Sequence, residues 1–209
     1  MTKQLVIVFV KNIELGKVKT RLAKTISNQG AFHVYSELVK ITKTVIKNID
    51  VDTYVFFSKR IEQTEWNNSK KFVQDGNDLG ERMKNAFAKA FQDGYEAVIL
   101  IGSDLPDINS AHILSGLKKL KTSNVVFGPA ADGGYYLVGM TKVYNTIFDN
   151  KPWSQSNLLE STLKELQQQK LSYTLLETLN DIDTFEDLEQ SNLYKTNIRL
   201  QEQLKILKA

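Results

Sequence analysis

Short apolar runs alternate with longer amphipathic stretches along this chain, and that alternation constrains the fold more than any other feature. Each run is short and rich in aliphatic and aromatic side chains, as expected of strands buried on both faces. The runs cover residues 5–10, 53–57, 97–101, 124–128 and 135–139. Apolar stripes at helical spacing lie between or after them, over residues 32–49, 79–91 and 158–166, with Gly94 placed as a helix C-terminal cap. The order strand, helix, strand implies right-handed crossovers, so the sequence predicts an α/β protein with a largely parallel sheet.

The composition narrows the kinds of partner and chemistry. The chain has 209 residues, of which 42% are hydrophobic and 24% charged, and this fits one compact domain. Its net charge of +3 is not gathered into a basic run, so small anions are expected partners and nucleic acid is not. There is no cysteine, which excludes disulfides and thiolate chemistry, and there are two histidines. A metal is therefore expected to be a hard cation on oxygen ligands.

No membrane span or secretory signal is predicted. The apolar run at residues 5–10 continues into KNIELGKVKTR without a small-residue cleavage site. No stretch approaches the roughly 20 apolar residues that cross a bilayer. A soluble cytoplasmic protein is expected, and residues 192–207 are predicted to form a packed helix through Leu193, Leu200, Leu204 and Leu207.

The loop after the first run is a candidate site for nucleotide phosphates. In sheets of this kind ligands bind beyond the carboxyl ends of the strands, and this loop contains Gly16, Lys17, Lys19 and Arg21. A glycine lets the backbone approach a ligand, and flanking cations neutralise phosphate oxygens. The loop is not a Walker P-loop, because Val18 follows Lys17. The alternative is a solvated basic turn that enters a helix.

The segment GSDLPDI brings Asp104 to the carboxyl end of the run at 97–101. A carboxylate at this place can hold Mg²⁺ or Mn²⁺ against a diphosphate. In the alternative, Asp104 or Asp107 caps the following helix. Asp183 could be a second ligand of the same ion if the sheet brings the two loops together. Asp183 with Glu186 three residues on also has the form of a capping box.

Two other loops contain candidate substrate contacts. Asp132 precedes Gly133 and Gly134, which together form either a simple tight turn or a place where a substrate lies against the backbone. In the second case Asp132 accepts hydroxyl hydrogen bonds or a proton. Trp153, in a loop that contains proline, either anchors local packing or stacks on a sugar.

The segment QDGNDLGERM opens the predicted helix at 79–91. Its acidic residues complement the helix dipole in one interpretation. In the other, Asp78 and Arg82 contact the base or the ribose of a nucleotide. His33 and His112 fall on predicted helices and receive no role.

Together these motifs resemble a known family. The segments GKVKTRL, GNDLGERM, GSDLP, DGGYYLVG and DIDTFEDL follow the family's order and cover the chain to about residue 190. They resemble the bacterial DUF2064 group, also called transferase 1 associated with radical-SAM/selenodomain proteins. That group is similar in fold to nucleotide-diphospho-sugar transferases and more distantly to guanylyltransferases. The resemblance implies a GT-A-like, three-layer α/β/α fold with a mostly parallel central sheet.

The resemblance also implies roles for single residues and parts of the chain. Gly16, Lys19 and Arg21 match the nucleotide-phosphate loop, and Asp104 matches the metal-binding aspartate. The segment from Asp132 to Gly134 matches the sugar or acceptor loop, and Asp183 matches a later acidic motif. Two positions depart from the family pattern: Leu15 replaces an expected proline, and Ser103-Asp104 replaces two aspartates one residue apart. One domain over residues 1–209 is expected, with a nucleotide-binding half at 1–104, an acceptor-binding half at 105–191 and a C-terminal helix at 192–209.

Three classes of function follow. A glycosyltransferase would use Mg²⁺ or Mn²⁺ to move a sugar from a nucleotide diphosphate to a small-molecule acceptor, with Asp132 as the base. A nucleotidyltransferase would join a nucleoside triphosphate to a phosphorylated small molecule, and would need a second cationic cluster that the sequence does not offer. A nucleotide-binding protein without turnover is the third class. The sugar transferase is the expected one.

Overall fold

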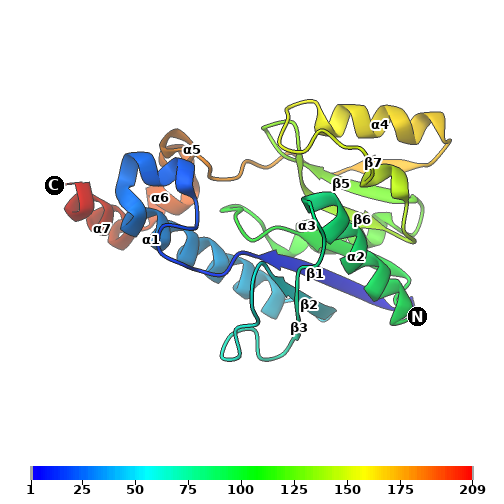
Figure 1. The fold of residues 1–209 in the computed structure, drawn as a ribbon, viewed down its shortest axis with the longest axis horizontal. Helices are drawn as coiled ribbons and strands as arrows, with labels where there is room; N and C mark the ends of the chain where they lie inside the picture. The colour runs from blue at the N-terminus through cyan, green and yellow to red at the C-terminus, as the bar shows by residue number, and fades with distance from the viewer. Residues whose placement is uncertain (1, 209) are drawn as a thin grey trace.

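The computed structural model describes residues 2–208 and contains a seven-stranded sheet between helices (Figure 1). The strand order is β3-β2-β1-β4-β6-β5-β7. Only β6 runs antiparallel to its neighbours, and the other pairings are parallel. The bounds are β1 Gln4–Val10, β2 Asp52–Phe57, β3 Lys70–Val73, β4 Ala97–Ile101, β5 Val125–Pro129, β6 Tyr135–Met140 and β7 Tyr173–Leu175. The predicted α/β class with a mostly parallel sheet is confirmed.

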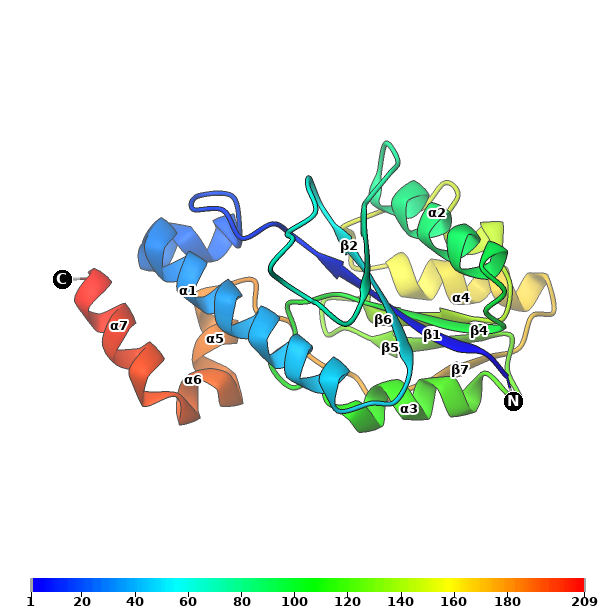
Figure 2. The same cartoon turned by 90° about the horizontal axis from the view of Figure 1, so that it is seen from below.

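Helices cover both faces of the sheet, which gives three layers (Figure 2). Helices α1 and α3 pack on one face, and α2 and α4 with the short helix η1 pack on the other. Three small helices follow at the end of the described chain. The bounds are α1 Thr20–Lys47, α2 Leu79–Gln92, α3 Ser110–Lys119, η1 Asn145–Ile147, α4 Leu158–Gln168, α5 Phe185–Gln190, α6 Asn192–Thr196 and α7 Ile198–Lys208.

Strand β4 shows why the apolar runs become central strands. Its sequence AVILI is buried along its whole length. Side chains alternate between faces in a strand, so Ile99 and Ile101 join the core under α1 and α3, while Val98 and Leu100 join the core under α2 and α4. A strand without polar residues therefore contributes apolar side chains to the cores on both faces of the sheet.

The edge strands were not predicted from the sequence. Strand β3, KKFV, and strand β7, YTL, are short and contain no fully buried residue. Each pairs with a single neighbour at the rim of the sheet. An edge strand half exposed to water needs no apolar run, so the signal that marks the central strands is missing.

The sequence predicts one continuous helix over residues 192–209, and this prediction is wrong. The structure breaks it at Asn197, between α6 and α7, and the Asn197 side chain accepts a hydrogen bond from the Leu200 backbone amide at 3.0 Å. Asparagine side chains compete with helical hydrogen bonds in this way. Leu200 and Leu204 are nevertheless buried, as the apolar spacing predicted.

Helix α7 packs against the first part of α1, beside the sheet (Figures 1 and 2). Helix α1 is bent at Ile26 and Ser27, and Ser27 has a φ of 68°. A Cβ atom added at Gly30 would lie 3.0 Å from a methyl group of Leu204, so this glycine allows the two helices to approach. No helix in the described part of the chain is long and apolar enough to span a membrane.

Candidate functional site

The candidate residues gather at the carboxyl edge of the sheet. The loops after β1 and β4 reach this edge because both strands are parallel. The turn at 130–134 reaches it from the opposite direction, because β6 is antiparallel to β4 and begins where β4 ends. Residues 179–183 join them through a bridge between Ala130 and Leu179. Four segments distant in sequence thus meet in one place.

Lys19 is the centre of this group. Its ammonium lies 3.1 Å from a carboxylate oxygen of Asp104 and 3.0 Å from one of Asp183. Only 8% of Lys19 is exposed, and its backbone is left-handed with a φ of 46°. Burial alone would lower the pKa of Lys19, but the two carboxylates outweigh that effect and raise it. Lys19 is therefore a charged ammonium held between the two predicted metal ligands.

The site contains more negative than positive charge. Burial raises the pKa of Asp181 to about 6, and the carboxylates of Asp104, Asp183 and Asp132 add to the rise, with Lys19 opposing it. Burial also acts to raise the pKa of Asp104, but Lys19 more than offsets this and lowers it. The site thus has four aspartates, of which Lys19 contacts two, Asp104 and Asp183. In the described part of the chain no three such side chains are already arranged around a metal position.

The donor set nevertheless fits a hard divalent cation. All four carboxylates are oxygen donors of the kind that Mg²⁺ and Mn²⁺ prefer. The carboxylates of Asp104, Asp183 and Asp132 add to the effect of burial in raising the pKa of Asp181, so the four aspartates repel one another. A divalent ion would relieve the same repulsion.

A buried hydrogen-bond network fixes the loop that carries Asp104. The Tyr35 hydroxyl, on α1, lies 2.8 Å from the hydroxyl of Ser103 and accepts a hydrogen bond from the Lys11 backbone amide at 2.9 Å. Lys11 follows β1 and Ser103 follows β4. Tyr35 therefore joins the ends of two strands next to the candidate metal ligand.

A second network organises the loop after β2. Asn12, which is buried, accepts a hydrogen bond from the Lys59 amide at 2.9 Å and donates to the Arg60 carbonyl at 2.9 Å and to Glu62 at 2.8 Å. Glu14 pairs with both Lys59 and Arg60. These bonds fix the backbone of residues 58–62 beside the loop after β1.

The other residues of the predicted phosphate loop are more exposed. Gly16 has a φ of 74°, and the Lys17 amide donates to the Glu14 carbonyl at 3.0 Å, which forms a turn. The Lys17 side chain faces solvent. Arg21 is 71% exposed and lies 3.3 Å from Asp183. The loop thus presents two accessible cations beside the buried Lys19.

A cavity of about 230 Å³ adjoins the aspartates. Its lining includes Asp104, Asp132, Gly134, Tyr135, Trp153 and Asp181. The Gly134 amide donates to Asp132 at 2.9 Å and so orients that carboxylate. Among the described residues that line the cavity there is no lysine or arginine. The cavity therefore offers hydrogen-bond acceptors and aromatic surface, without a cation of its own.

Close packing shapes one wall of this cavity. Gly133 has a φ of 90°, and a Cβ atom there would lie 1.8 Å from the Ser156 carbonyl oxygen. The Trp153 ring lies against Gly80, where an added Cβ would be 2.4 Å from the ring. Trp153 is thus a packing anchor that also lines the cavity, and its stacking on a sugar stays a prediction.

Asp78 and Arg82 are engaged in the turn that opens α2. Asp78 caps the helix by accepting from the Glu81 amide at 2.8 Å. Arg82 donates to the Gly76 carbonyl at 3.0 Å. Their neighbours Leu79 and Met83 reach the cavity. The structure therefore gives both residues a local structural role, and their contact with a nucleotide stays a prediction.

Two capping predictions are wrong. Helix α3 is capped by Asn109 in a capping box with His112, and Asp107 instead accepts a hydrogen bond from the Asn192 side chain at 3.1 Å. Helix α5 is capped by Thr184 with Asp187, one residue later than the predicted box of Asp183 and Glu186. Neither Asp104 nor Asp183 caps a helix, and the carboxylates of both contact Lys19.

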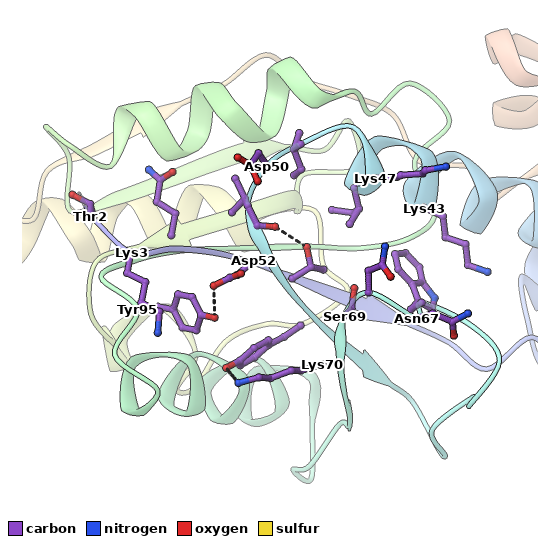
Figure 3. Close-up of a pocket in the computed structure, with 18 residues that line it drawn as sticks. Thr2, Lys3, Lys43, Lys47, Asp50, Asp52, Asn67, Ser69, Lys70 and Tyr95 are labelled. Atoms are coloured by element: carbon purple, nitrogen blue, oxygen red, sulfur yellow. Dashed lines mark hydrogen bonds between the residues drawn. The ribbon is translucent and has the colours of Figure 1, made fainter.

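A larger groove, of about 980 Å³, lies at the opposite, amino end of the strands (Figure 3). Its lining includes Lys3, Asp52, Tyr54, Lys70 and Tyr95. Several of these side chains bind one another: the Tyr95 hydroxyl donates to Asp52 at 2.8 Å, and Lys70 lies over the Tyr54 ring. Ligands of parallel sheets bind at the carboxyl ends, so the smaller cavity is the better candidate.

The fold and this edge of the sheet define the class of nucleotide-diphospho-sugar transferase folds. A crystal structure of a candidate nucleotide-diphospho-sugar transferase from Desulfovibrio desulfuricans is similar over 98% of this chain and 99% of that one, with a TM-score of 0.85 and 30% identity. The chain belongs to the DUF2064 family, described as "Uncharacterized protein conserved in bacteria", whose model matches residues 41–155. The predicted family and fold are confirmed.

Two proteins with more distant similarity to this chain have stated activities. The 2-phospho-L-lactate guanylyltransferase of Methanocaldococcus vulcanius is 23% identical over 205 residues, which are 96% of this chain and 90% of that protein. Glucosyl-3-phosphoglycerate synthase of Mycobacterium tuberculosis, solved with Mn²⁺, UDP and glucosyl-3-phosphoglycerate, has a TM-score of 0.52 at 13% identity, covering 97% of this chain and 80% of that one. Proteins similar to this chain in sequence or in fold thus include transferases of both kinds, nucleotidyl and glycosyl.

Proposed function

We propose that this protein transfers a sugar from a nucleotide-diphosphate sugar to a small-molecule acceptor. The observation that carries the proposal is the cavity beside Asp104, which combines aspartates, Tyr135 and Trp153 and has no lysine or arginine among its described lining residues. A hydroxyl-rich neutral ring suits carboxylate acceptors and an aromatic face. A phosphorylated substrate would need cations there.

The nucleotide would bind over the first half of the chain, residues 1–104. Lys17 and Arg21 are exposed beside Gly16 and are the cations available to its phosphates. The loop at 58–62, held by Asn12, adds Lys59 and Arg60 at the same edge. The acceptor would bind over residues 105–191, whose turn at 132–134 lines the cavity.

Asp104 and Asp183 would hold Mg²⁺ or Mn²⁺, and when bound the ion would supply positive charge to the leaving diphosphate. Lys19 holds these carboxylates together before any ion arrives. Asp132, oriented by the Gly134 amide, is the residue proposed to accept the proton of the acceptor hydroxyl. Because Asp132 is exposed, the proton that it accepts can pass to solvent.

Nucleotidyl transfer is the second candidate, because a guanylyltransferase matches nearly the whole chain. It would join a nucleoside monophosphate unit to a phosphorylated small molecule and release pyrophosphate. The two reactions share the proposed metal and phosphate positions. They differ in the group that enters the cavity.

Product analysis separates these functions. The protein is incubated with Mg²⁺ or Mn²⁺ and with panels of nucleotide sugars and nucleoside triphosphates, and products are identified by mass spectrometry. Release of a nucleoside diphosphate from a sugar donor supports sugar transfer, and release of pyrophosphate supports nucleotidyl transfer. Thermal stabilisation by a nucleotide without any product would indicate a binding protein without turnover and would contradict both.

A further inference from the structure

Leu79, the first residue of α2, belongs to the apolar stripe of that helix and yet lies half outside the core. Leu79, Met83 and Phe87 follow one another on the same side of the helix. Their exposed fraction falls along the helix, from 47% for Leu79 to 4% for Met83 and 0% for Phe87. Leu79 and Met83 both line the cavity beside the aspartates. The apolar stripe of α2 thus leaves the core and continues into the cavity.

Hydrogen bonds fix the turn that carries Leu79. Asp78 caps the helix by accepting from the Glu81 amide at 2.8 Å, and the Glu81 carboxylate accepts from the Asn77 amide at 2.7 Å. Such reciprocal bonds hold the first turn of a helix in one conformation. Leu79 is therefore presented to the cavity from a fixed backbone.

Trp153 lines the same cavity from a different segment of the chain. Its ring lies against Gly80, the residue after Leu79, where an added Cβ would be 2.4 Å from the ring. The loop is anchored two residues earlier, because the fully buried ammonium of Lys151 lies 2.7 Å from a carboxylate oxygen of Glu165 on α4. Leu79 and Trp153 are thus neighbouring parts of one apolar surface, the Leu79–Trp153 wall.

The cavity therefore offers two kinds of contact. Asp104, Asp132 and Asp181 line it with carboxylate oxygens, and the Leu79–Trp153 wall lines it with carbon. A ligand that suits both has hydroxyl groups to donate and an apolar face, as a pyranose ring does. The cavity volume of about 230 Å³ is below the roughly 300–1,000 Å³ of sites for drug-sized ligands, so one small ring fits best.

We propose that Leu79 is a specificity-determining residue and that the Leu79–Trp153 wall binds the C–H face of the transferred sugar. The hydroxyl groups of the same ring donate to the carboxylates that line the cavity. The ligand class is a neutral pyranose attached to a nucleoside diphosphate. This inference rests on the proposed sugar transfer, and it names the face of the sugar that the protein recognises.

The test compares Leu79→Asn with a matched control, Leu114→Asn. Both leucines lie on helices and are exposed to nearly the same extent, 47% and 46%. Leu114 is on α3, which packs on the other face of the sheet from α2. Asparagine has about the size of leucine and lacks its apolar surface, so each variant removes the same kind of contact.

Calorimetry with Mn²⁺ measures the affinities of UDP-, GDP-, ADP- and dTDP-glucose and of the matching nucleoside diphosphates. Leu79→Asn is expected to weaken the best glucose nucleotide by about fivefold, the effect of losing the burial of half a leucine side chain, and to leave its diphosphate unchanged. Leu114→Asn should change neither affinity. Leu79→Met should bind the glucose nucleotide like the parent, because methionine keeps an apolar contact of similar volume.

Four results would overturn the inference. In the first, Leu79→Asn binds the glucose nucleotide like the parent, or loses as much affinity for the diphosphate. In the second, Leu79→Met loses as much as Leu79→Asn, so the contact is not apolar. In the third, Leu114→Asn weakens the glucose nucleotide equally. In the fourth, no glucose nucleotide binds the parent more tightly than its diphosphate. None of these results depends on turnover, so product analysis decides on sugar transfer separately.

Discussion

The Lys19 ammonium lies 3.1 Å from the Asp104 carboxylate, across the gap between the loops after β1 and β4. The same ammonium contacts Asp183 at 3.0 Å. A side chain of the predicted phosphate loop thus occupies the space between two predicted metal ligands. The stability of the site and its affinity for metal are therefore coupled.

Replacing Lys19 with methionine should destabilise the protein by about 2 kcal/mol near neutral pH. Removing one partner of a buried ion pair leaves charge uncompensated, although Asp104 and Asp183 keep about a third or more of their side chains exposed, which reduces the effect. The pKa of Lys19 is raised, so its contribution is complete at neutral pH and is lost only in strong alkali. Urea unfolding measures the change.

Mn²⁺ should restore more stability to Lys19→Met than to the parent, because an ion can replace the lost ammonium. Arg21→Met is the matched control, since Arg21 pairs with Asp183 from an exposed position and should contribute about 0.5 kcal/mol or less. Equal effects of Mn²⁺ on all three proteins would argue against a metal at Asp104 and Asp183.

Asp104→Asn should weaken Mn²⁺-dependent nucleotide binding by about tenfold or more, because the amide keeps an oxygen and loses the charge. Asp183→Asn should behave similarly. Asp107→Asn is the control: Asp107 accepts a hydrogen bond from Asn192 at the surface, and an amide oxygen can still accept it. Calorimetric titration with and without Mn²⁺ gives the three affinities. Parent-like binding by Asp104→Asn would show that the metal lies elsewhere.

Tyr35→Phe should cost about 1–3 kcal/mol of stability, because the Lys11 amide and the Ser103 hydroxyl lose their shared partner inside the protein. The same change should weaken Mn²⁺-dependent nucleotide binding, since Ser103 precedes Asp104. Chemical unfolding and nucleotide titration measure the two effects. Lost stability with unchanged binding would limit Tyr35 to a structural role.

The raised pKa of Asp181 predicts how the stability of the folded protein changes with pH. The folded protein holds a proton on Asp181 up to about pH 6, whereas the unfolded chain releases it near 3.8. Between these values the folded state binds more protons, so stability falls as pH rises and the cost is complete above about pH 6. Asp181→Asn should remove this fall and stabilise the protein at pH 7 by about 1 kcal/mol or more. Unfolding curves from pH 4 to pH 7 show whether the slope changes.

Gly133→Ala and Gly94→Ala separate strain from close approach. Both glycines have a positive φ, 90° and 85°, so alanine is strained at either position. An added Cβ at Gly94 meets nothing within 4 Å, whereas at Gly133 it would overlap the Ser156 carbonyl. We expect about 1 kcal/mol of destabilisation at Gly94 and clearly more at Gly133, by thermal unfolding. Equal losses would show that the turn at 133 can move away from Ser156.

The sequence predicted the central strands and missed the edges for a physical reason. Strands β1, β2, β4, β5 and β6 must satisfy two cores and therefore carry apolar runs, whereas β3 and β7 lie at the rim. The amino-acid sequence of β6 does not indicate that this strand runs antiparallel to its neighbours. This direction follows from pairing with β4 and β5, which is a property of the assembled sheet.

Sequence reasoning found most of the loops of the candidate site and missed the residues that hold them. Asp104 and Asp183 were selected as strand-end and loop carboxylates, and the structure brings both to Lys19. Tyr35 gave no signal, because a tyrosine within an apolar pattern has the pattern of a core residue. Its hydroxyl contacts depend on the distance between elements far apart in the chain.

The residues joined by the bond between Lys19 and Asp183 are 164 positions apart in the sequence, so they leave the ribosome at very different times. A ribosome releases β1 and the loop with Lys19 first, Asp104 after a further 85 residues, and Asp183 much later. Until then the nascent chain has the Lys19 ammonium in the loop after β1 with at most one of its two carboxylate partners. The last helices, which pack against the start of α1, are made later still. The site is therefore among the final parts of the molecule to form, and a chain interrupted before Asp183 carries the sheet without its chemistry.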